Sequence, residues 1–286
     1  MTDLPPRRAD ELLRAAVGHL RLAGVPDPRV DAELLLAHVL GTSRGRAQAV
    51  ALIGTSLPTP AAERYRDLVL RRGAREPLQH LTGTAAFRRI ELAVGPGVFV
   101  PRPETEVLVE HVIRGLPAGG RVVDLGTGSG AIALSVAHER PDAQVVGVER
   151  SREAFVWAQR NLARVAAANA RIVLDDLADA VPEWDGTVDV VVSNPPYVPD
   201  GMIPRDPEVQ RFDPPAALYG GPDGLDPMRA VVRTALRLLQ PGGLLAVEHG
   251  ELQGAAVRAL LGDPWLDAAT HPDLTGRDRV TTARLR

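Results

Sequence analysis

The chain has 286 residues, of which 45% are hydrophobic and 24% charged, and its formal net charge at pH 7 is −3. This is the composition of a globular protein long enough for two domains, and the small negative charge argues against extensive neutralisation of nucleic acid phosphates. The absence of cysteine excludes disulfides, thiolate metal sites and a cysteine nucleophile.

The first twenty residues mix charged and apolar side chains, whereas a signal peptide needs an unbroken apolar core. No apolar run in the chain reaches the ~18 residues that a membrane-spanning helix requires. We therefore expect a soluble, cytoplasmic protein with no membrane partner.

Residues 8–82 place apolar side chains at spacings of three and four, which predicts helices without strands. Glycines at 24, 41 and 54 stand where such helices would end. Residues 1–82 are therefore predicted to form a small helical domain. Arginines concentrate in residues 66–75, which is typical of a solvated face but would also suit an acidic or RNA-rich partner.

Residues 83–103 change to β-like sequence around the turn signal Gly95-Pro96-Gly97, and we predict a hairpin linker with its turn there. In residues 104–286, apolar runs of strand length alternate with helical segments, the pattern of a parallel sheet covered on both faces. The predicted fold class is α/β, with a catalytic domain after the helical domain and the linker. Two β-like pieces around Gly276 are expected to close the sheet as a hairpin.

A glycine-rich turn joins a predicted strand to a predicted helix. The turn, called the glycine turn below, consists of Gly126, Thr127, Gly128, Ser129 and Gly130. Its glycines allow positive φ and a close approach of backbone to ligand, and the helix adds unpaired N–H groups. Glu149 ends the next strand about 20 residues later, where an acidic side chain can accept ribose hydroxyls. A tight turn without a ligand, and a simple surface carboxylate, are the alternatives.

The glycine turn and Glu149 suit either a dinucleotide or S-adenosylmethionine, and the turn by itself decides little between them. A dinucleotide fingerprint reads G-x-G-x-x-G, and this turn is one residue shorter in its second gap. Asp124, just before the turn, would place a carboxylate near a cationic sulfonium, whereas the same charge suits a pyrophosphate poorly. The pattern favours S-adenosylmethionine.

The run Asn194, Pro195, Pro196 and Tyr197 follows the fourth predicted strand of the catalytic domain. Its prolines end the strand and stiffen the turn at the sheet edge where open α/β sheets bind ligands. The Asn194 side-chain carbonyl and the Pro195 backbone carbonyl can accept hydrogen bonds from a substrate NH₂ group, and Tyr197 offers a ring for stacking. A polar turn would explain only the asparagine and one proline. We predict a site that methylates an amino nitrogen.

Four stretches, "PRPETE" at residues 101–106, "DLGTGSG", "NPPY" and "DGL" at residues 223–225, together resemble the N5-glutamine methyltransferases of class I peptide chain release factors. The resemblance implies a helical domain that grips the release factor and a Rossmann-like, seven-stranded methyltransferase domain. It also implies methylation of a glutamine in a GGQ-type loop, which tunes translation termination.

The same resemblance implies roles for particular residues. The glycine turn, Glu149 and Asn194 would bind S-adenosylmethionine, and residues 194–197 would hold the glutamine, with Asn194, Pro195 and Tyr197 as the catalytic set. Asp176 matches the acidic position before the residue that contacts adenine, and Leu177 stands where some members carry an aromatic side chain.

Two further segments bear on the choice of substrate. The complete run at residues 101–106 favours release factors over the related ribosomal-protein glutamine methyltransferases. Residues 211–226 resemble the loop after the active site, with Asp213 where glutamate is commoner, and they would contact substrate or serve as a passive connection.

Other interpretations remain open. A nucleic-acid adenine or cytosine amino-methyltransferase would use the same four residues on a flipped base, although the net charge disfavours a nucleic-acid substrate. A dinucleotide-dependent oxidoreductase and a non-catalytic binding module are the remaining alternatives. The histidine spacing does not predict a metal site.

Overall fold

The computed structural model describes residues 8–286, which form two compact units. The helical unit comprises the described residues up to Gly83 together with Arg205–Phe212. The catalytic unit comprises Thr84–Pro204 and Asp213–Arg286. Residues 1–7, which belong to the predicted helical domain and to the charged N-terminal stretch weighed against a signal peptide, lie outside the described part of the chain.

In its described residues the helical unit contains four helices where the apolar spacing predicts them, and a short fifth helix that the spacing does not predict. They are α1 (Ala9–Leu22), α2 (Pro28–Leu40), α3 (Arg44–Leu52), α4 (Thr59–Gly73) and α5 (Leu78–Thr82). Their apolar faces meet in one core that includes Leu20, Leu35 and Tyr65, and the Tyr65 hydroxyl donates to the Ala32 carbonyl at 3.0 Å. The predicted helical N-terminal region is confirmed.

A sixth helix of this unit, α9 (Pro207–Phe212), comes from far along the chain. Its Glu208 accepts hydrogen bonds from Arg72 at 2.8 Å and from Arg75 at 2.7 Å. Burial opposes ionisation, but these bonds lower the pKa of Glu208 to about 2. The ion pairs explain why α9 belongs to the helical unit, and nothing in the local sequence predicts them.

The catalytic unit begins with a hairpin of β1 (Thr84–Phe87) and β2 (Ile90–Ala93). Phe87 pairs with Ile90, so the turn lies at Arg88 and Arg89, and the prediction that it lies at Gly95–Gly97 is wrong. Arg88 adopts a positive φ of 49° without being glycine. Its guanidinium donates to Glu139 at 2.6 Å and its backbone N–H to Glu106 at 3.0 Å, and these tertiary contacts stabilise the turn.

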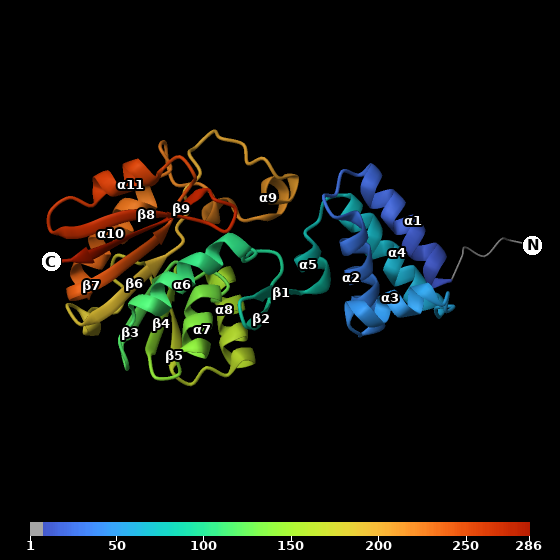
Figure 1. Cartoon of the computed structure of the whole chain (residues 1–286), viewed down its shortest axis with the longest axis horizontal. Coiled ribbons are helices and arrows are strands. Elements are labelled where there is room, and N and C mark those ends of the chain that lie inside the picture. The colour runs from blue at the N-terminus through green and yellow to red at the C-terminus, as the bar shows by residue number, and fades with distance from the viewer. Residues whose placement is uncertain (1–7) are drawn as a thin grey trace, which may run out of the picture. The chain divides into compact units, whose positions relative to one another are not determined.

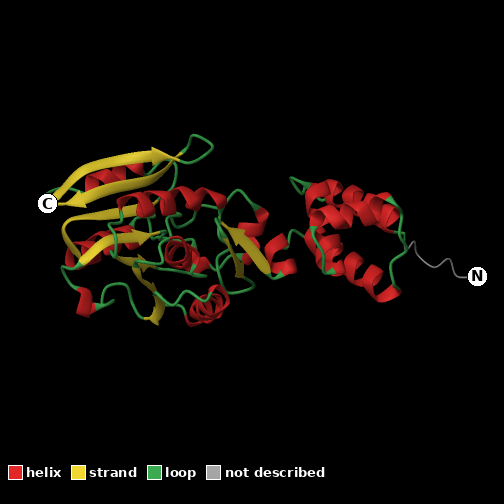
Figure 2. Cartoon of the chain, turned by 60° about the horizontal axis from the view of Figure 1, so that its bottom comes forward, coloured by secondary structure: helices red, strands yellow, loops and turns green. Residues whose placement is uncertain are grey.

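A sheet of seven strands follows, in the spatial order β5-β4-β3-β6-β7-β9-β8. The five parallel strands are β3 (Arg121–Leu125), β4 (Gln144–Glu149), β5 (Ala170–Leu174), β6 (Val188–Ser193) and β7 (Leu239–Glu248). The antiparallel hairpin of β8 (Trp265–Pro272) and β9 (Asp278–Leu285) completes the sheet, as Figure 2 shows. The predicted Rossmann-like α/β fold and its closing hairpin are confirmed.

Helices cover both faces of this sheet (Figure 1). Those on one face are α6 (Glu106–Gly115), α7 (Ala131–Glu139) and α8 (Arg152–Val165), and those on the other are α10 (Asp226–Leu238) and α11 (Gly254–Leu260). Neighbouring strand residues alternate between the two cores, as Val190 and Val191 of β6 do. This double burial explains the nearly continuous apolar sequence of the strands.

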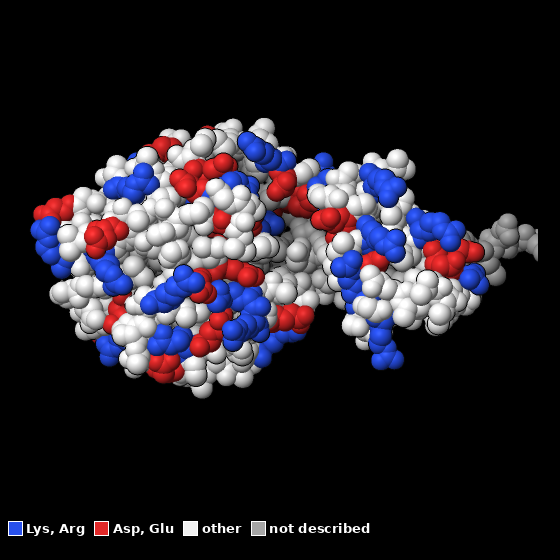
Figure 3. Space-filling model, viewed as in Figure 1, with Lys and Arg blue, Asp and Glu red and all other residues white. Residues whose placement is uncertain are grey.

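On the face drawn in Figure 3, arginine and acidic side chains of the catalytic unit lie in small, interspersed groups. None of the helices in residues 8–286 has the combination of length and apolarity needed to cross a bilayer.

Candidate active site

The carboxyl ends of four parallel strands meet at one edge of the sheet. Asp124 of β3 pairs with Gly147 of β4, and Ser193 of β6 pairs with Val247 of β7. This register places the glycine turn, Glu149, Asn194 and Glu248 at the same edge, where open α/β sheets bind ligands.

The glycine turn has the conformation that its sequence predicts. Gly126, Gly128 and Gly130 have φ values of 77°, 59° and 85°. A Cβ atom added to Gly126 or Gly128 would meet nothing within 4 Å, whereas one on Gly130 would lie 2.9 Å from Leu134. The first two glycines therefore leave open space beside the backbone, and this space fits a ligand that approaches closely.

Asp124 braces the glycine turn from within the protein. One of its oxygens, Oδ2, accepts from the Thr127 hydroxyl at 2.6 Å and from the Ala133 N–H at 3.2 Å. Burial raises the pKa of Asp124 to about 7. The side chain is 0% exposed. Asp124 thus connects the turn to the start of α7 and offers no exposed surface to a ligand.

Glu149 lies directly against the glycine turn. Its Oε2 accepts from the Gly128 N–H at 2.9 Å, and its Oε1 accepts from the Ser151 N–H at 2.8 Å. These bonds hold the carboxylate in one orientation. Because a carboxylate has about four acceptor sites, both oxygens can still accept from ribose hydroxyls.

Asp176 and Leu177 follow β5, beside the end of β4. The neighbouring Asp175 N–H donates to the Glu149 carbonyl at 3.0 Å. Asp176 is exposed and accepts from the Ala178 N–H at 3.0 Å, while Leu177 is half-buried against the core. Both residues lie next to Glu149 along the edge, and their contact with adenine stays a prediction.

Asn194 is half-buried, and its Nδ2 donates to Thr105 Oγ1 at 3.3 Å. In residues 8–286 no donor is bound to its carbonyl oxygen Oδ1. The Asn194 N–H group is therefore bound within the protein, and its Oδ1 can accept a hydrogen bond from a bound ligand.

A glycine-containing loop supports the backbone of the Asn-Pro-Pro-Tyr run. A Cβ atom on Gly220 would lie 2.5 Å from the Pro196 carbonyl oxygen, and one on Gly224 would lie 2.3 Å from the Tyr197 carbonyl oxygen. Gln253 also donates to that Tyr197 oxygen at 3.0 Å. The loop at residues 211–226 is thus packed against the motif, where its glycines are needed for close approach.

Sequence reasoning missed Glu248, Thr105 and Arg279. Glu248 ends β7 next to Asn194, is 2% exposed, and has no partner for its Oε2 in the described part of the chain. Burial raises the pKa of Glu248 to about 7, against the effect of a Thr105 hydrogen bond and the charge of Arg279. The signal was present, because Glu248 ends an apolar strand just as Glu149 does.

Tyr197, three residues after Asn194, lies at the same edge of the sheet. It is half-buried, and burial raises the pKa of its hydroxyl to about 12, with the nearby Glu248 acting in the same direction. The phenol is therefore neutral at physiological pH and can serve as a ring and a hydrogen-bonding group.

Comparison with known proteins agrees with this geometry. The family model described as PrmC N-terminal domain matches residues 11–83, and the methyltransferase small domain model matches residues 90–206. The chain is 47% identical to a release factor glutamine methyltransferase of Streptomyces coelicolor over 94% of this chain and 95% of that protein. A protein of the same name from Mycolicibacterium smegmatis is also 47% identical, with 95% of each chain covered. The chain belongs to the release factor glutamine methyltransferase family.

Membership of this family makes the chain an S-adenosylmethionine-dependent methyltransferase. The open space beside Gly126 and Gly128 and the fixed carboxylate of Glu149 fit this cofactor. Another relative acts on a different substrate: the 4-amino-L-phenylalanine/4-methylamino-L-phenylalanine methyltransferase of Streptomyces pristinaespiralis is 41% identical over 99% of this chain and 97% of that protein.

Two segments that resemble this family in sequence meet in the structure. Arg102 donates to Asp213 at 2.6 Å, and its guanidinium lies 5.0 Å from the centroid of the Phe99 ring. Burial raises the pKa of Asp213, although Arg102 acts against this shift. The 101–106 segment and the 211–226 segment are thus joined by the ion pair of Arg102 and Asp213.

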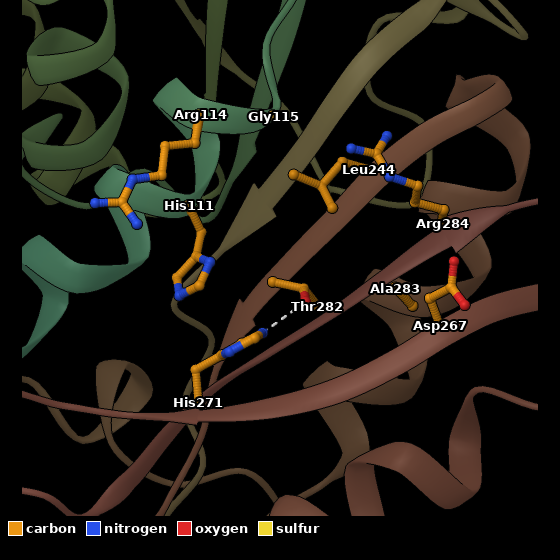
Figure 4. Close-up of a pocket in the computed structure, with 9 residues that line it drawn as sticks. All are labelled: His111, Arg114, Gly115, Leu244, Asp267, His271, Thr282, Ala283 and Arg284. Carbon is orange, nitrogen blue, oxygen red and sulfur yellow. Dashed lines mark hydrogen bonds between the residues drawn. The ribbon is translucent and has the colours of Figure 1, made fainter.

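A pocket of about 260 Å³ lies elsewhere in the catalytic unit, between α6 and the β8–β9 hairpin (Figure 4). The rings of His111 and His271 face each other there with centroids 4.2 Å apart, and His271 contacts Thr282 at 2.9 Å. None of the predicted site residues lines this pocket. Residues 8–286 contain no group of three or more acidic or histidine side chains placed to hold a metal ion.

Proposed function

We propose that this chain methylates the side-chain amide nitrogen of a glutamine in class I peptide chain release factors. The observation that carries the proposal is the orientation of Asn194. Its Nδ2 is bound to Thr105, while its Oδ1 remains an acceptor at the edge where the carboxyl ends of the parallel strands meet. An acceptor at this place suits a substrate that presents N–H groups. The relatives at 47% identity are release factor glutamine methyltransferases, and this supports glutamine as that substrate.

The amide nitrogen is a weak nucleophile because its lone pair is delocalised into the carbonyl group. When bound, S-adenosylmethionine supplies an electrophilic methyl group on a positively charged sulfur. We assign Asn194 Oδ1 and the Pro195 carbonyl oxygen as acceptors for the two N–H groups of the substrate amide. They would hold the amide nitrogen at roughly 3–3.5 Å from the methyl carbon.

The same acceptors stabilise the positive charge that develops on the N–H groups during transfer. After transfer the methylated nitrogen carries a positive charge and is far more acidic, and it loses its proton to water. Tyr197 is assigned to pack on the planar amide, and Pro196 keeps the turn stiff. In this proposal the protein orients the substrate and needs no strong base.

The cofactor would be held by the glycine turn, by Glu149 through its ribose hydroxyls, and by Asn194. Asp176 and Leu177 are assigned to the adenine end, because they lie beyond Glu149 along the edge. We further assign release factor recognition to the helical domain at residues 1–82, joined through a linker at residues 83–103 to the catalytic domain at residues 104–286. Because release factors act on ribosomes, we place the reaction in the cytoplasm.

The relative that methylates an aromatic amine supports a second candidate substrate class, a small molecule with an exposed NH₂ group. The same acceptors would bind either substrate. A nucleic-acid substrate is not proposed, since the chain is acidic and Figure 3 shows no continuous basic stripe on the face drawn.

The test uses the purified chain with labelled S-adenosylmethionine and four substrates offered separately. These are an intact release factor, the same factor with its loop glutamine replaced by alanine, 4-aminophenylalanine, and an adenine-containing DNA. We expect one methyl group on the loop glutamine, located by mass spectrometry, and none on the alanine variant. Transfer to 4-aminophenylalanine or DNA, with none to the release factor, would overturn the proposal.

A further inference from the structure

We infer that Thr105 and Glu248 are positioning residues that fix the side-chain amide of Asn194 with its carbonyl oxygen toward the substrate. The inference rests on the proposed function, because it concerns the acceptor that would hold the substrate amide. Neither residue is assigned to contact the substrate, so both act through Asn194.

The three residues come together from separate elements. Thr105 ends the 3₁₀ turn Pro103–Thr105, Asn194 follows β6, and Glu248 ends β7. The pairing of Ser193 with Val247 makes Asn194 and Glu248 neighbours across the sheet edge. Thr105 and Glu248 are 4% and 2% exposed, so water cannot readily replace their hydrogen bonds.

The chemistry of these groups fixes the direction of the hydrogen bonds. Thr105 Oγ1 accepts from Asn194 Nδ2 at 3.3 Å, so its own hydrogen is free to go to a different acceptor. Glu248 is the buried carboxylate beside Asn194, and the side chains of Thr105 and Asn194 favour its ionised form. We assign the hydroxyl hydrogen of Thr105 to this carboxylate. An ionised carboxylate can only accept, so it holds the Asn194 amide with its N–H side inward.

Without this direction the Asn194 amide could rotate by half a turn. Its Nδ2 would then face the N–H groups of the substrate, donor against donor, and the substrate nitrogen would lose the acceptor that orients it. A buried carboxylate that serves only packing would not require the hydroxyl of Thr105. The Thr105 hydroxyl is therefore the part of the network whose removal tests the inference most directly.

The protonation state of Glu248 enters the same argument. Burial raises the pKa of Glu248 to about 7, and the charged groups that face it are Arg279 from β9 and Glu104 from the 3₁₀ turn, with the Tyr197 hydroxyl nearby. A protonated Glu248 can donate a hydrogen bond to Thr105, and the Asn194 amide is then no longer held in one orientation. Turnover should therefore rise as Glu248 loses its proton between about pH 6 and pH 8.

The experiment compares Thr105→Val, which keeps the shape and loses the hydroxyl, with Thr105→Ser, which keeps the hydroxyl. Thr105→Val should lower kcat for an intact release factor by about tenfold to hundredfold, as expected when a reacting group is misplaced. KM and the Kd for the cofactor should change little, and Thr105→Ser should recover most of the lost turnover. Thr234→Val on α10, at a threonine that is also 4% exposed, is the matched control and should keep normal turnover.

Two further measurements separate positioning from a structural effect. In an Asn194→Ala background, single-turnover rates should be unaffected by adding Thr105→Val, because the residue through which Thr105 acts is gone. Glu248→Gln should remove the rise in turnover between pH 6 and pH 8, while thermal melting checks that the variant is folded. Additive effects in the double variant, or a normal rate in Thr105→Val, would overturn the inference.

Failure of the proposed function would look different. If the unaltered chain methylated no release factor, the substrate assignment would fail at the first measurement. If it did so and Thr105→Val matched it, only the positioning role would fail.

Discussion

Glu149 uses both carboxylate oxygens on backbone N–H groups while it faces the cofactor edge. We predict that Glu149→Ala weakens S-adenosylmethionine binding by at least about tenfold, because hydrogen bonds to a charged group contribute roughly 1.5 to 3 kcal/mol. Calorimetric titration measures the Kd. Glu149→Gln is the control for the lost charge, and a Kd that is unchanged in the alanine variant would remove Glu149 from the site.

The hydrogen bond that Asn194 Oδ1 accepts should become stronger as positive charge develops on the substrate amide. Asn194→Ala should therefore reduce single-turnover methylation of a release factor by on the order of a hundredfold or more, with a smaller effect on cofactor affinity. Circular dichroism should show a normal fold. Normal single-turnover rates in this variant would contradict the assignment of Asn194.

Local sequence predicted the glycine turn, Glu149 and the run from Asn194 to Tyr197, because each is a residue pattern at a strand end. It did not predict Thr105 or Glu248 as parts of the site. Asn194 and Thr105 are 89 residues apart in the chain, and only the strand order and the position of the 3₁₀ turn bring them together. Side-chain networks of this kind depend on tertiary structure, which no short motif contains.

At the scale of elements, the loop that supports the Asn-Pro-Pro-Tyr run depends on glycine. Gly224 has a φ of 74°, and a Cβ atom there would lie 2.3 Å from the Tyr197 carbonyl oxygen. We predict that Gly224→Ala lowers both stability and turnover, since it combines backbone strain of about 1–2 kcal/mol with a steric clash that displaces Tyr197. Urea unfolding and methylation assays measure the two effects.

Gly242 provides the matched control for this change. Its φ is 80°, but an added Cβ atom would meet nothing within 4 Å. Gly242→Ala should cost only the backbone strain and keep normal turnover. Equal losses of turnover in the two variants would show that the close approach to Tyr197 has no functional role.

The strands and helices of the catalytic unit could be predicted from their apolar patterns. The strands are nearly continuous apolar runs, and the helices place apolar residues at spacings of three and four. The β1–β2 turn could not be. Its Arg88 takes a conformation that usually favours glycine, and it is stabilised by Glu106 and Glu139, which lie far along the chain. The Gly95-Pro96-Gly97 signal was therefore the stronger local candidate and was misleading.

At the scale of the whole molecule, the helical domain is expected to bind the release factor away from the reacting amide. Deletion of residues 1–82 should leave cofactor binding intact and lower methylation of an intact release factor by at least about tenfold, which corresponds to ~1.4 kcal/mol of lost binding. Calorimetry and methyl-transfer assays measure the two properties.

The deletion also leaves Glu208 of α9 without Arg72 and Arg75. The full-length Glu208→Gln variant shows how much of the loss comes from these ion pairs alone. Full methylation by the truncated chain would contradict a role for the helical domain in recognition.

The position of α9 also bears on the order in which the protein can form during synthesis. A ribosome releases α1 to α5 first and then Thr84–Pro204, so Arg72 and Arg75 have emerged long before Glu208 is made. The helical unit therefore acquires its last helix only after four of the five parallel strands exist. A nascent chain halted before Pro207 would hold Arg72 and Arg75 without Glu208, and among the described residues only Arg72 would keep another carboxylate partner, Asp31 at 2.7 Å. The helical unit would therefore stay incomplete until most of the sheet had been synthesised.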